Sequence, residues 1–202
     1  MMTVRKTSAA AERIVDIAAD LFYRQGYRAT GINQVIRDSG VAKATFYNHF
    51  ATKDDLCLSC LDILKIRELD FLDAFMAEKK DLGIEPYFLS IIESLRPWSL
   101  QTEFRGCGFI NIAAEVPDPA SPLRNKGKEL YDEIRRRVHE LCRTLIHSDD
   151  DRYGHLDESE LTNHYMLAFA GAVVYLELYR DITYVDQALD TMRRLIGEQT
   201  CD

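Results

Sequence analysis

The chain of 202 residues has few of the residues that interrupt regular structure, with only ten glycines and five prolines. It also has no alternating apolar and polar stretch of the kind that predicts strands, no repeat and no low-complexity tract. Because 47% of the residues are apolar, the chain can still form a sizeable core. We therefore expect an all-α fold of about nine helices.

Long apolar segments are missing as well. The longest uncharged apolar run, residues 165–176, is twelve residues long, whereas a helix needs about 20 to cross a bilayer. The N-terminal MMTVRKTSAA lacks the apolar core of a signal peptide. We expect no contact with a membrane and a cytoplasmic location.

Motifs for catalysis and metal binding are absent from the sequence. The five cysteines are an odd number, which argues against a disulfide framework. Cys57 and Cys60 form a C-x-x-C pair without the second pair that a zinc site needs. The five histidines lack metal-ligand spacing, and no G-x-S-x-G, phosphate-binding glycine loop or H-E-x-x-H occurs. We expect no enzyme activity, no cofactor and no metal.

The net charge of −8 is unevenly distributed along the chain. Residues 1–53 hold eight Lys or Arg against four acidic residues, a net +4, so the remainder carries −12. A basic head on an acidic body suits a protein that contacts nucleic acid at one end only.

Residues 30–53, TGINQVIRDSGVAKATFYNHFATK, predict two short helices joined by a tight turn and then the start of a long helix. Thr30 is a typical N-cap residue for the first of them. Gly40 follows that helix, where a left-handed residue ends a helix at little cost. Phe46 and Phe50, four residues apart, are expected to hold the second helix against the protein.

The other sides of the second helix carry hydrogen-bond donors, a small residue and an aromatic hydroxyl, with no carboxylate among them. These residues are Lys43, Ala44, Thr45, Tyr47, Asn48 and His49. A two-turn helix of about 10 Å fits the major groove of double-stranded DNA. We expect Lys43, Ala44 and Asn48 to contact base edges. Tyr47 and His49 are expected to contact phosphates.

Lys53 is expected at the first position of the long helix, which Thr52 would cap. A cation there opposes the helix dipole, and a phosphate bound at this helix N-terminus would account for it. Lys53 is therefore a third candidate phosphate ligand. Whether Thr30 also holds a phosphate, besides capping its helix, is open.

These segments carry a family resemblance. LFYRQGYRATGINQVI followed by GVAKATFYNHFATKDDL resembles the DNA-binding domain of the tetracycline-repressor (TetR/AcrR) family of bacterial transcription regulators. The resemblance covers roughly residues 9–64. It implies a helix-turn-helix that contacts a DNA operator, and a fourth helix whose shift transmits effector binding. Asn48 stands where relatives often carry an aromatic residue, which leaves the operator sequence open.

Beyond residue 64 only length and helical organisation resemble that family. The long helix extends to about residue 80, a fifth helix ends near Pro97, and the acidic stretch 148–157 is expected to be exposed. No linker composition separates two parts of the chain. We divide it into a helix-turn-helix DNA-binding domain, residues 1–53, and an effector-binding and dimerisation domain, residues 54–202.

Residues 165–176 are apolar on all sides, which predicts a helix that is covered all round. A central core helix in a monomer would satisfy the pattern, and so would a partner subunit. We favour a homodimer through the last two helices, since helix-turn-helix proteins read two half-sites about 34 Å apart and the resemblance implies the same interface.

For a small-molecule effector the sequence offers only candidates. The polar ones, Asn111 and Glu115, lie four residues apart on a short apolar helix. The aromatic ones are Phe71, Tyr87, Trp98, Phe104, Phe109, Tyr165 and Phe169. Aromatic residues at helical spacing also form plain core, so this alternative stays open.

The function that these observations favour is a homodimeric, ligand-responsive transcriptional regulator, a repressor released from a palindromic operator by a small molecule. One alternative is a thiol-based sensor that uses Cys107, which lies between two glycines beside Arg105. Another is a helical interaction protein without a DNA function. The sequence does not identify the operator, the effector or the regulated genes. It also does not distinguish a repressor from an activator.

Overall fold

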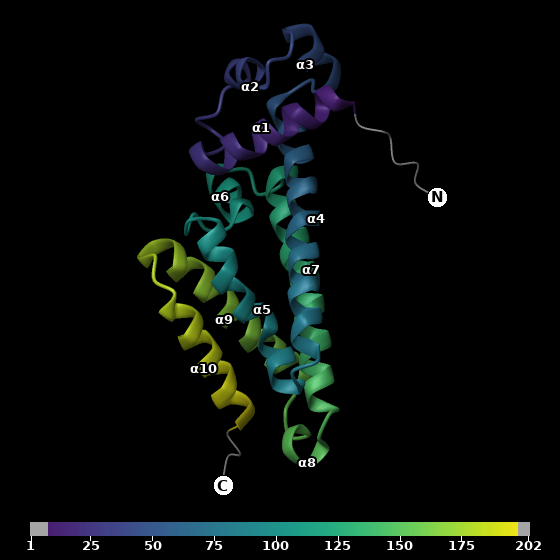
Figure 1. Ribbon diagram of the computed structural model, residues 1–202, viewed down its shortest axis with the longest axis vertical. Helices are drawn as coiled ribbons and strands as arrows, with labels where there is room; N and C mark the ends of the chain where they lie inside the picture. The colour runs from purple at the N-terminus through teal and green to yellow at the C-terminus, as the bar shows by residue number, and fades with distance from the viewer. Residues whose placement is uncertain (1–7, 198–202) are drawn as a thin grey trace, which may run out of the picture. The chain divides into compact units, whose positions relative to one another are not determined.

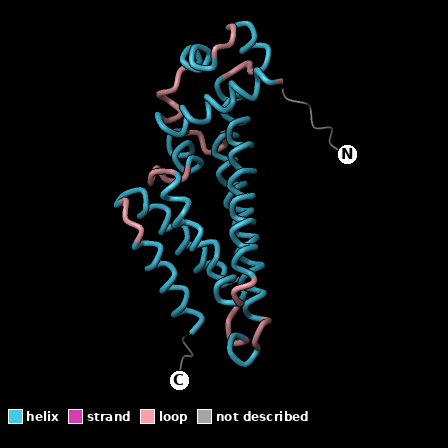
Figure 2. Tube along the Cα trace, in the orientation of Figure 1, coloured by secondary structure: helices cyan, strands magenta, loops and turns pink. Residues whose placement is uncertain are grey.

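The computed structural model describes residues 8–197, and within this range it contains ten helices and no strand (Figures 1 and 2). The predicted all-α fold is confirmed. None of the helices in the described range combines the length and the hydropathy that a membrane span requires. The N-terminal arm and Cys201 lie outside the described residues.

The chain packs into two compact units, each formed from two separate segments. The first unit comprises Met1–Arg67 and Gly108–Glu129, and the second comprises Glu68–Cys107 and Leu130–Asp202. The sequence-based division after residue 53 concerns function rather than packing, and it stays a prediction.

The first unit contains three N-terminal helices, the beginning of two long helices and one short helix. These are α1 (Ala9–Gln25), α2 (Ile32–Ser39), α3 (Lys43–His49), α4 (Lys53–Lys80) to residue 67, α6 (Gly108–Glu115) and α7 (Pro122–Ile146) to residue 129. The Ser8 hydroxyl caps α1 by accepting the N–H of Ala11. Helix α1 buries Ile14, Ala18 and Phe22, which lie on one face at the spacing of a helix.

The second unit contains the rest of α4 and α7 and four further helices. These are α5 (Ile84–Gln101), α8 (Asp150–Tyr153), α9 (Glu158–Tyr179) and α10 (Thr183–Gly197). Tyr165 of α9 is fully buried, and its hydroxyl accepts the N–H of Ile92 in α5 at 3.2 Å. Arg137 of α7 holds Asp73 of α4 through two bonds of 2.6 and 2.7 Å, so charged groups also tie this unit together.

One expectation about this unit was wrong. Helix α5 does not end near Pro97 but continues to Gln101 with the proline inside it. Pro97 has no backbone N–H to donate within the helix. The hydroxyls of Ser99 and Thr102 donate to carbonyl oxygens of this last turn and stabilise it. The stretch 148–157 is exposed as expected, except at Tyr153 and Leu156, and it contains the additional short helix α8. Tyr153 is buried and donates its hydroxyl to Glu85 at 2.9 Å.

Candidate nucleic-acid interface

Helices α2 and α3 meet at a tight turn that begins with Gly40. This residue adopts the left-handed conformation, with φ of 65° and ψ of 26°. A side chain at this φ is strained, so glycine suits a chain that must end α2 and start α3 only three residues later. The predicted helix, turn and helix are therefore present (Figure 1).

Helix α3 has one buried side and one exposed side. Phe46 is fully buried and Phe50 is 7% exposed, with their ring centroids 6.0 Å apart. On the other side the candidate contacts are exposed, except for Thr45, which is half-buried; they are Lys43, Ala44, Tyr47, Asn48 and His49. Because Lys43, Tyr47 and their neighbours follow helical spacing, they form one polar face that an approaching groove can contact.

His49 is oriented by the start of α1. The Ser8 hydroxyl lies 3.1 Å from Nε2 of His49, while the same oxygen accepts the N–H of Ala11. The hydroxyl can donate to Nε2 or accept from it, according to the tautomer of the ring. The N-terminal end of α1 therefore lies beside the exposed end of α3.

Lys53, the first residue of α4, has structural partners of its own. Its ammonium donates to the carbonyl oxygens of Tyr27 at 3.0 Å and Thr30 at 3.3 Å, and it lies 4.3 Å from the centroid of the Tyr27 ring. The expected cap by Thr52 is confirmed, since its hydroxyl accepts the N–H of Asp55 at 3.0 Å. The fold alone thus explains a lysine at this helix end, and contact with phosphate stays a prediction.

The N-cap expectation for Thr30 was wrong. Gly31 occupies the N-cap position of α2. Thr30 is fully buried, and its hydroxyl is shared between the carbonyl oxygens of Leu21 at 3.2 Å and Gly26 at 2.8 Å. The side chain therefore closes the connection between α1 and α2 from inside. Its role toward DNA stays a prediction.

The connection of residues 26–30, hereafter the 26–30 loop, is also held by the side chain of Glu115, the last residue of α6. One carboxylate oxygen of Glu115 accepts the N–H of Tyr27 at 3.1 Å, and the other accepts the N–H of Arg28 at 2.7 Å. Gly26 has φ of 94°, and a Cβ there would lie 2.6 Å from the carboxylate. The sequence gives no signal for this contact, because Glu115 follows Tyr27 by 88 residues.

Tyr27 is fixed at both of its polar ends. Besides its backbone bonds to Glu115 and Lys53, its hydroxyl donates to Asp54 in the first turn of α4. Burial, followed by the hydrogen bond to Asp54, raises the pKa of Tyr27. The phenol therefore stays protonated at neutral pH and continues to donate.

The effector candidates of the second unit divide by burial. Tyr165 and Phe169 are core residues, since Tyr165 lies edge-on to Phe88 at 5.3 Å and Phe169 edge-on to Tyr131 at 6.2 Å. The remaining four are half-buried; they are Phe71, Tyr87, Trp98 and Phe104. Trp98 is distinguished by a polar contact, because its indole N–H lies 3.4 Å from a carboxylate oxygen of Glu68.

The other three effector candidates belong to α6 in the first unit. Phe109 is 3% exposed and lies close to Gly127, and Asn111 is half-buried. Glu115 uses both oxygens on the 26–30 loop, so a contact with an effector would require these bonds to break. Contact with an effector stays a prediction for all three.

The buried cysteines of the described range are unlike reactive thiolates. Burial raises the pKa of Cys57 to about 12 and that of Cys142 to about 11, which leaves both thiols protonated. Cys107 is half-buried, and Arg105, which was expected to activate it, forms an ion pair with Glu177 at 3.3 Å. These features do not favour the thiol-sensor alternative. No group of metal-ligating side chains occurs within residues 8–197.

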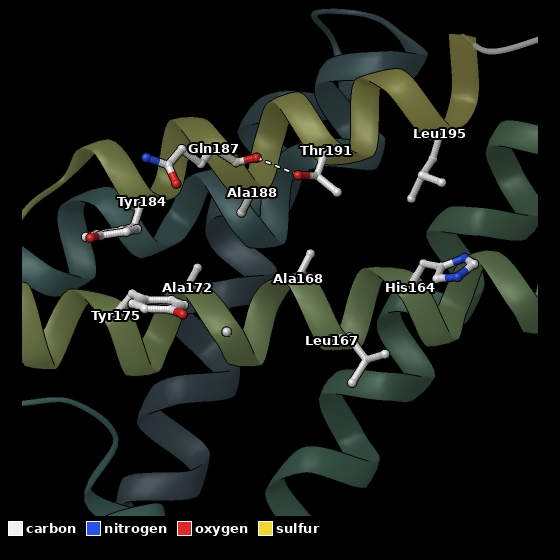
Figure 3. Close-up of a pocket in the computed structure, with 11 residues that line it drawn as sticks. His164, Leu167, Ala168, Ala172, Tyr175, Tyr184, Gln187, Ala188, Thr191 and Leu195 are labelled. Carbon is white, nitrogen blue, oxygen red and sulfur yellow. Dashed lines mark hydrogen bonds between the residues drawn. The ribbon is translucent and has the colours of Figure 1, made fainter.

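Helices α9 and α10 expose an apolar surface that includes a groove of about 540 Å³ (Figure 3). Small residues, Ala168, Ala172 and Ala188, lie along it, and Tyr175 stacks on Tyr184 with centroids 4.9 Å apart. Leu167 and Leu178 of α9 are 71% and 68% exposed. Contiguous apolar surface of this kind marks an interaction site.

Comparison with known proteins gives consistent results. The family model for bacterial regulatory proteins of the tetR family matches residues 14–60. The HTH-type transcriptional regulator LmrA of Bacillus subtilis is 32% identical over 127 residues, which cover 60% of this chain and 65% of LmrA. A helix-turn-helix regulator of Lactococcus lactis is 20% identical over 95% of both chains.

Solved structures show the same fold. A TetR-family transcriptional regulator from Streptomyces coelicolor aligns with a TM-score of 0.76 and 24% identity, covering 93% of this chain and 94% of that one. A TetR transcriptional regulator from Chloroflexus aurantiacus aligns with a TM-score of 0.77 and 23% identity, covering 94% and 95%.

The placement of Thr30 gives a test of what its hydroxyl does. Thr30→Val keeps the shape but removes the buried hydroxyl bonds to Leu21 and Gly26, while the Gly26 carbonyl still accepts the backbone N–H of Thr30 at 3.3 Å, so we expect a loss of about 1 kcal/mol of stability. Thr30→Ser keeps the donor and should lose less. Urea unfolding of both variants measures this. An undiminished stability of Thr30→Val, with DNA affinity lost, would instead assign the hydroxyl to phosphate binding.

Proposed function

Because the chain belongs to the TetR family of bacterial regulatory proteins, and is thus a transcriptional regulator rather than an enzyme, we propose that it is a homodimeric repressor. In this proposal it binds a palindromic DNA operator in the cytoplasm and releases it when a small molecule binds. The observation that carries the proposal is the polar, carboxylate-free face of α3, held outward by Phe46 and Phe50.

The proposed contacts with base edges come from the start and the end of α3. The helix is about 10 Å long, and the major groove admits a helix of this kind. Lys43 and Asn48 are exposed, and their side chains suit guanine and adenine edges respectively. Ala44 between them allows close approach and can contact a thymine methyl group.

The proposed contacts with phosphates come from side chains that the protein already orients. Tyr47 is 44% exposed, and its ring lies edge-on to buried Phe46 at 5.3 Å, which leaves the hydroxyl at the surface. His49 is positioned by Ser8. The ammonium of Lys53 has three N–H groups and uses two on the 26–30 loop, so the third can donate to a phosphate oxygen.

We assign residues 1–53 to DNA binding and residues 54–202 to effector binding and dimerisation. The exposed apolar surface of α9 and α10 supports a second copy of this chain as its partner. A two-fold dimer would then present two α3 helices to two half-sites of a palindrome.

Release of DNA requires that the effector prefers the form that does not bind DNA, since equal affinity for both forms shifts nothing. Two helices are suited to carry the change in this proposal. Helix α4 contributes Lys53 to the 26–30 loop and continues into the second unit, and α6 contributes Glu115 to the same loop. A shift of either helix would move the connection that positions α2 and α3.

The first test is binding of the full-length protein to DNA from the region upstream of its own gene, at several salt concentrations. We expect tight binding that weakens about 10³-fold or more between 50 and 200 mM salt, because phosphate contacts release counterions. Tyr47→Ala should bind at least about tenfold more weakly. Lys80→Ala, at the far end of α4, is the matched control and should bind like the unmodified chain.

Folded, dimeric protein that fails to bind genomic DNA fragments at low salt would contradict the DNA-binding function. Equal binding by Tyr47→Ala and the unmodified chain would contradict the assignment of α3. Either result would favour the alternative of a helical interaction protein.

The second test concerns the dimer. Leu167→Asp places a charge on the exposed apolar surface without removing a buried contact of the single chain, so we expect monomers at micromolar concentration and weaker DNA binding. Leu100→Asp, at a position of α5 that is 61% exposed, is the control. Sedimentation velocity measures both. A mass of 23.2 kDa for the unmodified protein, the mass of one chain, would contradict the proposal.

A further inference from the structure

Glu68 is the half-buried carboxylate whose partners differ from those of all others in the described range. Its carboxylate accepts one long hydrogen bond, from the indole N–H of Trp98 at 3.4 Å. The other half-buried carboxylates between residues 8 and 197 bind Lys, Arg or His side chains or backbone N–H groups. These pairs are Glu85 with Arg152, Glu93 with Lys79, Glu115 with the 26–30 loop, Glu133 with Arg137, Glu158 with His147 and Glu177 with Arg105.

The environment of Glu68 disfavours an unpaired negative charge. Burial raises the pKa of its carboxyl group, and the hydrogen bond from Trp98 opposes only part of this rise. A partly buried charge without a counter-ion costs folding free energy. Glu68 therefore does not stabilise the fold through its charge, and binding of a ligand is a physical reason for a carboxylate at this position.

Glu68 contacts the aromatic side chain of Trp98 and shares one side of α4 with another aromatic residue. Trp98 donates through the edge of its indole, and the face of an indole attracts cations more strongly than the faces of other aromatic rings. Phe71 lies three residues further along α4, on the same side of the helix as Glu68, and its ring is 6.2 Å from that of Phe75. A carboxylate beside aromatic groups can neutralise an organic cation and also cover its apolar substituents.

We propose that Glu68 and Trp98 bind an organic cation, an amine or quaternary ammonium with apolar substituents, and that the effector belongs to this chemical class. The role of this ligand as the effector rests on the proposed function, whereas the existence of the binding site does not. A metal ion fits poorly, because one carboxylate and an indole donor cannot supply the several oxygen or nitrogen ligands of a metal. Within the described residues no cluster of three or more His, Cys, Asp or Glu side chains could hold a metal ion.

Trp98 is the only tryptophan of the chain, so intrinsic fluorescence reports directly on this site. The full-length protein is titrated with phenyltrimethylammonium, with its neutral isostere tert-butylbenzene, and with the larger cation tetraphenylphosphonium. We expect at least one cation to change the fluorescence saturably. For phenyltrimethylammonium the affinity should exceed that of the isostere at least about tenfold, since the two differ only in charge.

Glu68→Gln keeps the size of the side chain and removes its charge. We expect this variant to bind the cations at least about tenfold more weakly and the isostere equally well. Glu93→Gln, which removes a carboxylate already paired with Lys79, is the matched control and should leave cation binding unchanged. Thermal unfolding at pH 7 checks the fold. Glu68→Gln should melt no lower than the unmodified protein, because a carboxyl with a raised pKa costs stability above that pKa.

The pH dependence has a defined direction. The pKa of Glu68 lies above the ordinary value of about 4.3, so cation affinity should fall as the pH falls through this raised pKa and the carboxylate is protonated. The affinity of tert-butylbenzene should not follow the same curve.

Equal affinity for phenyltrimethylammonium and tert-butylbenzene, unchanged cation binding in Glu68→Gln, or no fluorescence change with either cation at millimolar concentration would overturn the binding site. Binding at Glu68 that leaves DNA affinity unchanged would overturn its assignment as the effector site. Failure of the protein to bind DNA would contradict the proposed function and leave the fluorescence result intact.

Discussion

The placement of the helix-turn-helix depends on how one short connection is held. Within the 26–30 loop the N–H of Thr30 donates to the carbonyl oxygen of Gly26 at 3.3 Å, and side chains from other elements supply partners for further backbone groups. Lys53 supplies a cation to two of its carbonyl oxygens, and Glu115 supplies a carboxylate to two of its N–H groups. Thr30 closes the same loop from inside. Opposite charges from α4 and α6 thus fix the start of α2, and through Gly40 the direction of α3.

This arrangement gives Lys53 two uses that do not compete. The ammonium stabilises the loop in the absence of DNA, and its remaining N–H is free to meet a phosphate in the proposed complex. In the proposed function it also makes both α4 and α6 relevant to DNA affinity, because the first residue of α4 and the last residue of α6 hold the loop. An effector that displaced either helix would weaken bonds of about 3 Å, whose strength depends steeply on distance and alignment.

The parts of this structure that the sequence predicted are those decided by local patterns. Gly40 ends α2, Phe46 and Phe50 hold α3, and Thr52 caps α4, since each depends on spacing and cap chemistry within a few residues. The errors arose where the packing of the chain decides. Thr30 is a buried donor rather than a cap because Leu21 and Gly26 offer carbonyls, and Glu115 reaches a loop 88 residues away. No local sequence pattern predicts such contacts.

The most direct measurement is the DNA affinity of Glu115→Gln and Glu115→Ala beside Glu103→Gln, an exposed control. Hydrogen exchange at the amides of Tyr27 and Arg28 is recorded on the same proteins. Gln has one acceptor oxygen and Ala has none, so both readouts should change in steps: exchange accelerates and DNA affinity falls from Glu to Gln to Ala, while the dimer persists. Faster exchange in Glu115→Ala with unchanged DNA affinity would contradict the claim that this loop positions the DNA-binding helices.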